Sequence, residues 1–260
     1  MSLNLALKMP VTEKSEYFHL SQLTRLNRNA IPQHIAIIPD GNRRWARKNL
    51  SKEEQGHREG ADILMETVKA ARELQVKVIT FFAFSTENWA RPEQEIICLM
   101  AIFTDYLLNQ RDEMIRCGIK LDTIGDLVRL PSFLNQVIEE TKEATRDCTD
   151  IRLVLAFNYG SRNELCRAFK LMLQDYENNH LSAEDVNEPT ISRYLDTGGW
   201  CDPELLIRTS GEVRISNFLL WQISYAEIHI SPVLWPEFTP QHLLNAILDY
   251  QDRNRRLGGP

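Results

Sequence analysis

Short apolar runs recur along the chain, and longer segments with helical periodicity separate them. Runs rich in Ile, Val, Leu and Phe predict strands at 34–38, 76–84, 119–124, 151–157, 203–208 and 226–230. Amphipathic spacing predicts helices at 57–74, 92–117, 131–147, 161–178 and 240–256. This alternation predicts a single α/β domain with a mainly parallel central sheet flanked by helices. Ligands are expected beyond the carboxyl ends of its strands.

The composition limits the class of protein. A chain of 260 residues with 43% hydrophobic content can supply a substantial core, and a net charge of −6 argues against general affinity for nucleic acid. Five widely spaced cysteines without a CxxC pair favour reduced thiols in a cytoplasmic protein. No apolar stretch reaches the roughly 18 residues of a membrane span. Residues 1–33 are polar and aperiodic and predict a flexible arm before the main domain, 34–260.

A basic cluster follows the first predicted strand. That strand ends at Pro39-Asp40-Gly41-Asn42, and the cations Arg43, Arg44, Arg47 and Lys48 come next. Gly41 can supply a turn, Asn42 can cap a helix, and guanidinium groups beside a helix start suit phosphate oxygens. Asp40 is then either an ion-pair partner or a ligand for Mg²⁺ carried on a diphosphate. The alternative is a solvated basic helix start with an internal salt bridge.

A second basic cluster lies near the end of the strand predicted at 203–208. Arg208 ends this strand, and Arg214 follows a turn at Ser210-Gly211. Both guanidinium groups can face one anion, and the Ser216 hydroxyl can donate a further hydrogen bond. The alternative is a pair of surface arginines bonded to Glu212.

A polar cluster follows the predicted strand at 76–84. It comprises Ser85, Glu87, Asn88, Trp89 and Arg91. Polar side chains at the end of a strand can position a substrate and assist a proton transfer. The alternative interpretation is a capped turn without a catalytic role.

Several segments resemble blocks of the cis-prenyltransferase family, which includes undecaprenyl diphosphate synthases, in the same order. They are PDGNRRWAR at 39–47, GHREGA at 56–61, AFSTENWARP at 83–92, NYGSRNE at 158–164 and LIRTSGEVRISNFLLWQISYAEI at 206–228. The resemblance spans roughly residues 34–257 and leaves only the N-terminal arm uncovered.

The resemblance implies an enzyme that condenses isopentenyl diphosphate onto farnesyl diphosphate. The implied product is a long-chain polyprenyl diphosphate, C55 undecaprenyl diphosphate, which serves as a precursor of the cell-wall carrier lipid. Mg²⁺ is the implied cofactor, the implied assembly is a homodimer, and the product is delivered to a membrane that the enzyme contacts peripherally. No nucleic-acid partner is expected. The alternative is a noncatalytic partner subunit, for which loss of Asp40 and its neighbouring arginines would be the sign.

The resemblance assigns binding roles position by position. Asp40 is the implied catalytic aspartate of the Mg²⁺–diphosphate complex, and Glu227 is the implied second metal ligand. The implied contacts of the allylic diphosphate are Gly41, Asn42, Arg43 and Arg44, and Trp45 is a further implied substrate contact. The implied contacts of isopentenyl diphosphate are Arg208, Arg214 and Ser216.

The resemblance also implies residues near the reacting carbons. Asn88, as a catalytic residue, and Ser85 are implied to organise condensation and proton removal. Glu87, Trp89 and Arg91 are implied substrate contacts, and the last two would shape a mobile lid.

The GHREGA block and its surroundings contain a further candidate and depart from the family pattern. His57 lies where the family has a loop that closes over the ligand, although a histidine at a helix start is more often a cap or an ion-pair partner. Glu53 stands where family members often carry an arginine, with Lys52 beside it as a possible substitute. Val213 stands where some relatives place a histidine near the metal.

The helix that begins near Pro92 carries an apolar face. Its members are Ile96, Leu99, Met100, Phe103 and Leu107. A face of this kind packs into a hydrophobic core in most helices. In an enzyme with a polyprenyl product it could instead line an apolar product tunnel.

Overall fold

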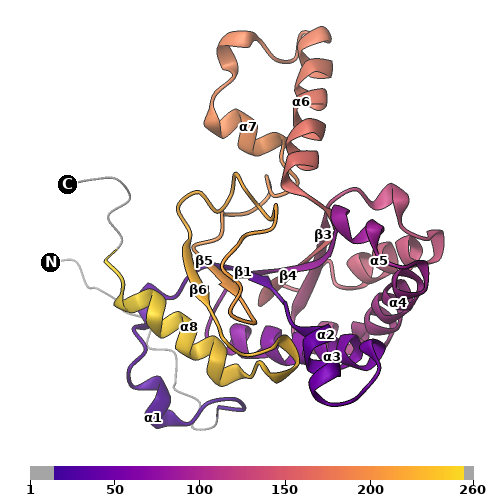
Figure 1. Cartoon of the computed structure of the whole chain (residues 1–260). Coiled ribbons are helices and arrows are strands. Elements are labelled where there is room, and N and C mark those ends of the chain that lie inside the picture. Colours follow the sequence, from indigo (N-terminus) through magenta and orange to yellow (C-terminus); the bar gives the residue numbers. More distant parts are fainter. Residues whose placement is uncertain (1–14, 255–260) are drawn as a thin grey trace, which may run out of the picture.

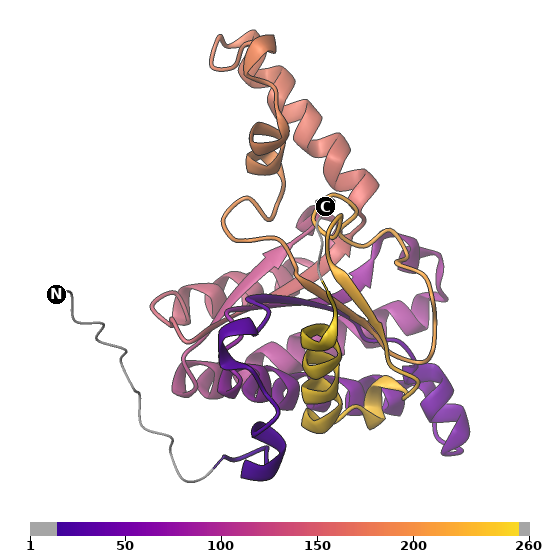
Figure 2. The ribbon, with the colours of Figure 1, turned by 90° about the vertical axis from the view of Figure 1, so that its left-hand side faces the viewer.

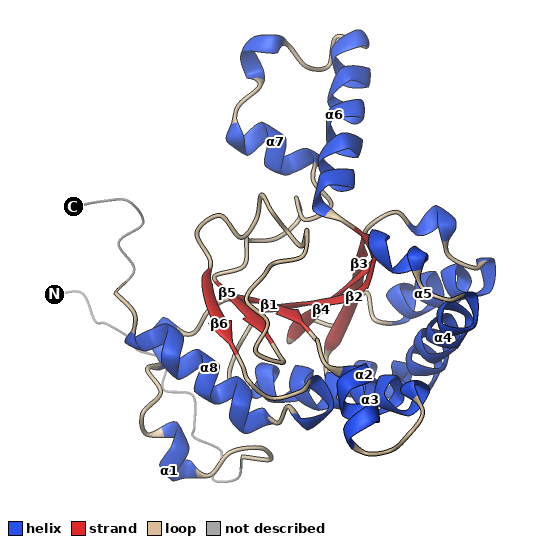
Figure 3. Cartoon of the chain, viewed as in Figure 1, coloured by secondary structure: helices blue, strands red, loops and turns tan. Residues whose placement is uncertain are grey.

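A six-stranded sheet forms the centre of the protein, and the computed structural model describes residues 15–254 around it. The strand order is β3-β4-β2-β1-β5-β6, and every neighbouring pair is parallel (Figure 3). The strands are β1 (His34–Ile38), β2 (Val78–Ser85), β3 (Ile119–Ile124), β4 (Ile151–Tyr159), β5 (Leu205–Arg208) and β6 (Glu227–Ile230). The predicted parallel α/β fold is therefore confirmed.

The central strands are apolar because both faces of the sheet are covered. All five residues of β1 are buried, which explains why its sequence reads as a continuous apolar run rather than an alternating one. Ile35 and Ile37 belong to the core on one face, and Ala36 and Ile38 belong to the core on the other. This division follows from the alternation of side chains along a strand.

Helices cover one face of the sheet. They are α2 (Asn42–Lys48), α3 (Glu53–Glu73), α4 (Glu93–Arg116), α5 (Ser132–Ala144) and α8 (Pro240–Asp252) (Figure 1). The other face is covered by the loop between β5 and β6, whose Phe218, Leu219 and Ile223 are buried. No helix within residues 15–254 is long and apolar enough to cross a bilayer.

A pair of helices projects away from the sheet. α6 (Ser161–Glu177) follows β4 directly, and α7 (Glu188–Tyr194) returns beside it, as both views show (Figures 1 and 2). Residues 161–178 were predicted to be helical, whereas α7 was not predicted. The seven residues of α7 carry no apolar stripe, so the sequence shows little helical periodicity there. The helix is recognised in the folded structure rather than in the sequence pattern.

Part of the predicted N-terminal arm contacts the main domain. Residues 15–33 include α1 (Leu20–Leu23), and both Phe18 and Ile31 are buried in the core. Gln251 of α8 donates hydrogen bonds to the carbonyl oxygens of Asn27 and Ala30, at 2.8 and 3.0 Å. Residues 1–14 of the arm and the last residues of the helix predicted at 240–256 lie outside the described residues.

His34 is a fully buried titratable residue at the start of β1. Its Nδ1 lies 2.7 Å from the carbonyl oxygen of Cys201, which can only accept, so Nδ1 carries the hydrogen. Its Nε2 lies 2.7 Å from Thr80 Oγ1 and therefore accepts from that hydroxyl. Burial lowers the pKa of His34 from 6.5 to about 4 because desolvation disfavours the imidazolium ion.

We predict that the protein loses stability as the pH falls from 6.5 to about 4. Between pH 6.5 and about 4 the unfolded chain binds a proton at His34 that the folded chain excludes. The free energy of unfolding therefore decreases as the pH falls, by about 3 kcal/mol at the lower end. Urea unfolding at about pH 7 and about pH 5 measures the effect. Thr80→Val keeps the titrating ring and should keep the slope, whereas an unchanged slope in His34→Gln would contradict the assignment.

Candidate active site

The site lies where β1 and β5 end side by side. Ile38 pairs with Arg208 in the parallel register, so the segment after Ile38 and the last residue of β5 meet at one edge of the sheet. The chain continues from β1 to β2 on one side, while β5 lies on the other. This is the position at which open α/β sheets form a crevice for ligands.

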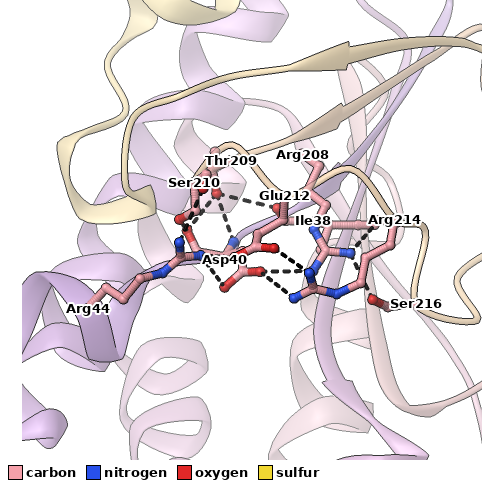
Figure 4. Close-up of polar contacts among 9 residues, drawn as sticks. All are labelled: Ile38, Asp40, Arg44, Arg208, Thr209, Ser210, Glu212, Arg214 and Ser216. Carbon is pink, nitrogen blue, oxygen red and sulfur yellow. Dashed lines mark hydrogen bonds and ion pairs between the residues drawn. The ribbon is translucent and has the colours of Figure 1, made fainter.

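Asp40 and Arg208 form an ion pair at this edge. Arg208 Nη2 donates to Asp40 Oδ2 at 2.8 Å, and Arg208 Nη1 donates to Ser216 Oγ at 2.7 Å and to the carbonyl oxygen of Arg214 (Figure 4). The Arg208 residue is only 4% exposed, so its charge is largely removed from water. A buried guanidinium needs such fixed acceptors because its desolvation is costly.

Two further arginines and one further carboxylate complete a charged cluster. Arg44 Nη2 lies 3.5 Å from Asp40 Oδ1 and 2.9 Å from Glu212 Oε1. Arg214 Nη2 lies 3.9 Å from Asp40 Oδ2, and Arg214 also pairs with Glu212. Arg44 and Arg208 approach Asp40 from opposite sides (Figure 4). The sequence offered two roles for Arg214, an anion contact or a partner of Glu212. In the structure Arg214 pairs with Glu212 and also faces the predicted anion site.

The backbone at Asp40 is held by the segment after β5 and by the loop before α8. The Asp40 carbonyl oxygen accepts hydrogen bonds from Thr209 Oγ1, Ser210 Oγ and the Trp235 amide, at 2.7, 2.7 and 3.0 Å. Gly41 is the N-cap of α2, with φ of 113°, and a Cβ there would lie 2.2 Å from Ser210 Oγ. Glycine is therefore required at position 41. Asn42, predicted as the cap, is instead the first residue of the helix.

The loop after β5 has an unusual backbone. Ser210, Ser216, Asn217 and Leu219 all have positive φ, between 48° and 73°. Residues other than glycine adopt this region at a cost, which surrounding contacts must offset. The loop carries Arg214 and Ser216 back to Arg208, and no sequence pattern predicted this path.

A cavity of about 250 Å³ lies beside the charged cluster. Its polar lining residues are Asp40, Asn42, His57, Ser85, Asn88, Arg91, Arg208 and Ser216. Its other walls are apolar and include Ala61, Leu64, Phe81, Leu99, Ile102, Phe103, Tyr106, Leu155 and Phe157. One cavity thus combines a charged mouth with a hydrocarbon-like interior.

The side chains of α4 that line the cavity differ in part from those predicted. Leu99 and Phe103 line it as predicted, but Ile96, Met100 and Leu107 are not among its lining residues. Ile102 and Tyr106 line it instead. Residues i, i+3, i+4 and i+7 share one helical face, so 99, 102, 103 and 106 face the cavity together. Met100 and Leu107 lie on the face that packs into the core.

His57 lies in the first turns of α3 rather than in a loop. Its Nδ1 is 3.4 Å from Asn42 Nδ2, and its Nε2 is 3.7 Å from Glu95 Oε1. Burial, with a contribution from Arg91, lowers the pKa of His57, so the ring is neutral near pH 7. Asn42 approaches closely because α3 has glycine at positions 56 and 60, where a Cβ would lie 2.2 and 2.6 Å from Asn42 oxygens.

Ser85 and Asn88 line the cavity, whereas two neighbours do not. Asn88 Oδ1 accepts from the Ser85 amide at 3.0 Å, so the predicted turn is capped and also faces the site. Trp89 Nε1 donates to Asn158 Oδ1 at 2.7 Å, and its ring packs on Phe84. Glu87 accepts from Asn217 at 3.1 Å. The last two residues fix the loop around the site and do not line the cavity.

Arg43 and Arg47 are bound to an acidic residue of α3. Glu53 Oε2 accepts from Arg43 Nε at 2.8 Å, and Glu53 Oε1 accepts from Arg47 Nη2 at 3.0 Å. Partial burial raises the pKa of Glu53, but hydrogen bonds from Arg43 and Arg47 outweigh it and lower the pKa overall. Trp45 lies on the same short helix and does not line the cavity. The negative charge at position 53 therefore engages two cations next to the site.

Glu227, the second predicted metal ligand, lies away from Asp40. It pairs with Leu205 in the β5–β6 register, three positions before Arg208, and Arg253 Nη1 lies 2.8 Å from its Oε2. Within one copy of residues 15–254, Glu227 and Asp40 are not brought together. The same residues contain no group of three or more His, Cys, Asp or Glu that could hold a metal ion.

Known proteins match this chain along most of their length. The model of the Prenyltransf family of undecaprenyl diphosphate synthases matches residues 38–258. An isoprenyl transferase of Bacillus thuringiensis subsp. konkukian is 47% identical over 229 residues, covering 88% of this chain and 89% of that protein. An isoprenyl transferase of Chlamydia trachomatis is 47% identical over 234 residues, covering 88% of this chain and 92% of that protein.

Two solved structures share the fold. Lavandulyl diphosphate synthase from Lavandula x intermedia, in complex with dimethylallyl diphosphate, has a TM-score of 0.87 at 32% identity, covering 88% of this chain and 99% of that chain. A probable undecaprenyl diphosphate synthase from Campylobacter jejuni has a TM-score of 0.73 at 30% identity, covering 87% and 98%. As its motifs predicted, the chain belongs to the undecaprenyl diphosphate synthase family of cis-prenyltransferases.

Proposed function

We propose that the protein is a Mg²⁺-dependent cis-prenyltransferase that condenses isopentenyl diphosphate onto farnesyl diphosphate. Its product would be a long-chain polyprenyl diphosphate, C55 undecaprenyl diphosphate, for the cell-wall carrier lipid. The observation that carries this proposal is a cavity with Asp40 and Arg208 at its mouth and apolar side chains behind them. A diphosphate ester of a hydrocarbon has this same division between a charged end and an apolar chain.

The arginine cluster supplies the electrostatic part of the mechanism. When the allylic carbon–oxygen bond breaks, negative charge grows on the departing diphosphate. Arg44, Arg208 and Arg214 already converge on Asp40 and can neutralise that charge once the ligand displaces the Glu212 side chain. The double bond of isopentenyl diphosphate then attacks the allylic carbon, and loss of one proton gives the new alkene.

The donor set fits Mg²⁺ that arrives with a diphosphate. Mg²⁺ prefers oxygen ligands, keeps several waters and commonly binds through one or two carboxylates together with substrate phosphates. Asp40 offers one such carboxylate at the cavity mouth. When bound, the ion would neutralise charge on the leaving diphosphate. Within one chain Glu227 lies away from Asp40. It could bind the same ion only if another chain supplied it.

The remaining polar residues of the mouth are suited to the proton and to orientation. His57 is neutral near pH 7, and its Nε2 has no hydrogen-bond partner within residues 15–254, so it can accept a hydrogen bond or a proton. Ser85 and Asn88 offer a hydroxyl and an amide at the same mouth. The dimethylallyl diphosphate bound to the lavender relative supports an allylic diphosphate as one substrate.

We also propose a homodimer that works in the cytoplasm and contacts the membrane peripherally when it releases its product. Apolar side chains remain exposed on α6 and near β6, namely Phe169, Leu173, Tyr176, Tyr225 and Ile228. A second copy would remove such surface from water. By contrast, Phe218, Leu219 and Ile223 of the loop between β5 and β6 are buried within the chain itself.

Purified protein incubated with farnesyl diphosphate, labelled isopentenyl diphosphate and Mg²⁺ tests the proposal. We expect label to enter lipid products, with C55 as the main species after dephosphorylation and chromatography, and we expect a chelator to abolish the reaction. No incorporation at any metal concentration would instead favour a noncatalytic partner subunit. Lipid products of another length would support the prenyltransferase activity and would contradict the C55 assignment.

Asp40→Asn should reduce turnover by at least about 100-fold while the fold is retained. The amide oxygen can still accept from Arg208, whereas Asp40→Ala would leave that buried charge unpaired at a cost of about 3–5 kcal/mol. Glu212→Gln is the matched control, because Glu212 belongs to the same cluster but does not line the cavity. Thermal melts verify folding, and an Asp40→Asn enzyme with most of its activity would exclude the assigned role.

Glu53→Gln should strengthen binding of a diphosphate anion by about 2–5-fold. The carboxylate engages Arg43 and Arg47 in two partly exposed ion pairs, each worth about 0.2–1 kcal/mol. Its neutralisation leaves both cations free for an anionic ligand. Titration with inorganic diphosphate measures the effect. Glu54→Gln makes the same charge change one residue away, where the partner is Arg58, and should have no effect; equal strengthening in both variants would indicate only a change in net charge.

A further inference from the structure

Asn217 follows Ser216 directly in the loop after β5 and joins this loop to two other segments. Its carbonyl oxygen accepts a hydrogen bond from the Ser161 amide at 2.9 Å, and its Oδ1 accepts one from the Arg162 amide at 3.0 Å. Its Nδ2 donates to Glu87 Oε1 at 3.1 Å. One side chain thus contacts both the start of α6 and the turn after β2.

The contacts with α6 complete the N-terminus of that helix. The first amides of a helix have no acceptor within the helix, and the side chain of the N-cap residue commonly supplies one. The N-cap of α6 is Gly160, which has no side chain to offer. A Cβ at position 160 would lie 2.5 Å from Thr86 Oγ1 and 2.8 Å from Asn217 Nδ2, so the three segments meet too closely for one. Asn217 supplies the acceptors from a distant part of the chain.

The backbone at Asn217 explains why fixed contacts are needed there. Ser216 and Asn217 both lie in the left-handed region, with φ of 52° and 61°. Residues other than glycine adopt this region at a cost, although asparagine tolerates it better than most. In this conformation Ser216 Oγ accepts from Arg208 Nη1 at 2.7 Å (Figure 4). The hydrogen bonds of Asn217 offset the cost of the two turns and hold Ser216 in place.

Asn217 lies between two groups of cavity residues. Ser216 belongs to the loop after β5, whereas Ser85 and Asn88 belong to the turn after β2, and all three line the cavity. The bond from Asn217 to Glu87 joins these two segments. Asn217 itself is not a lining residue. Its effect on a ligand is therefore indirect and acts through the relative position of the two segments.

We propose that Asn217 is a positioning residue that fixes Ser216 relative to Ser85 and Asn88 across the mouth of the cavity. This inference rests on the proposed function, in which groups from both segments hold two substrates at reacting distance. A misplacement of about 1 Å in such a site can lower the rate by about 100-fold. Affinity for the diphosphates is assigned to the arginine cluster, so a loss of positioning should lower kcat more than it raises KM.

Removal of the Asn217 side chain tests this role. In Asn217→Gly the side-chain contacts are lost, and glycine adopts the same φ without strain. We expect kcat for isopentenyl diphosphate incorporation to fall at least about 10-fold, while KM changes by less than about 3-fold. Asn179→Gly is the matched control, because Asn179 also has a left-handed backbone, with φ of 58°, but is exposed beyond the end of α6. It should change neither constant, and thermal melts verify the folding of both variants.

A second pair of variants tests the contact with Glu87 and serves even where the glycine variant does not fold. Asn217→Asp keeps the oxygen that accepts from the Arg162 amide but places a second carboxylate against Glu87, so kcat should fall. Addition of Glu87→Gln provides an amide that can donate to this carboxylate. Donor and acceptor are then exchanged, and kcat should recover at least about 5-fold relative to Asn217→Asp alone.

The outcomes distinguish this inference from the proposed function. No incorporation by wild type would refute the function itself, and the role of Asn217 with it. An active wild type whose folded Asn217→Gly variant keeps its kcat, or changes only its KM, would overturn the positioning role alone. An equal loss of kcat in Asn179→Gly would also overturn it, because the effect would then not depend on the mouth. Absence of recovery in the double variant would refute the link through Glu87.

Discussion

The structure of the site depends on the need of one buried guanidinium for fixed partners. Arg208 is nearly inaccessible to water, and an unpaired charge there would be strongly destabilising. Asp40 after β1 and Ser216 in the following loop both bond to it, at 2.8 and 2.7 Å. The ends of two neighbouring strands and the loop that follows β5 are thereby fixed relative to one another. The same contacts that satisfy the folded chain place an aspartate and its cations at one edge of the sheet.

The charges of the free protein are arranged so that a ligand can exchange for an internal carboxylate. Three arginines converge on Asp40 and Glu212, which leaves the cluster with excess positive charge. The backbone of Asp40 is held by hydrogen bonds, whereas Glu212 lies on the loop after β5 and its side chain pairs with Arg44 and Arg214. A diphosphate would therefore displace Glu212 more readily than Asp40. Electrostatic preorganisation of this kind avoids a large rearrangement when the ligand binds.

Sequence patterns predicted the sheet well because its central strands are continuous apolar runs, and β1 and β3 have the predicted bounds. They predicted the cavity face of α4 less well, since this helix is apolar toward both the core and the cavity and periodicity alone cannot separate the two. The β5–β6 register, which places Glu227 opposite Leu205, is a tertiary property that no local pattern encodes. The positive φ angles at Ser216 and Leu219 likewise arise from long-range packing.

Unsatisfied polar atoms concentrate at the cavity, and their positions divide it into two functional parts. Of the seven buried side-chain atoms without a partner in residues 15–254, four belong to cavity residues: Asn42 Oδ1, His57 Nε2, Arg208 Nε and Tyr106 Oη. The first three lie at the mouth, where diphosphate oxygens, bound water or a transferred proton can satisfy them. Tyr106 lies among the apolar lining residues Leu99, Ile102 and Phe103 of the same helix. A bound diphosphate would thus satisfy the unpaired groups of the mouth, whereas a hydrocarbon chain would leave the Tyr106 hydroxyl unpaired.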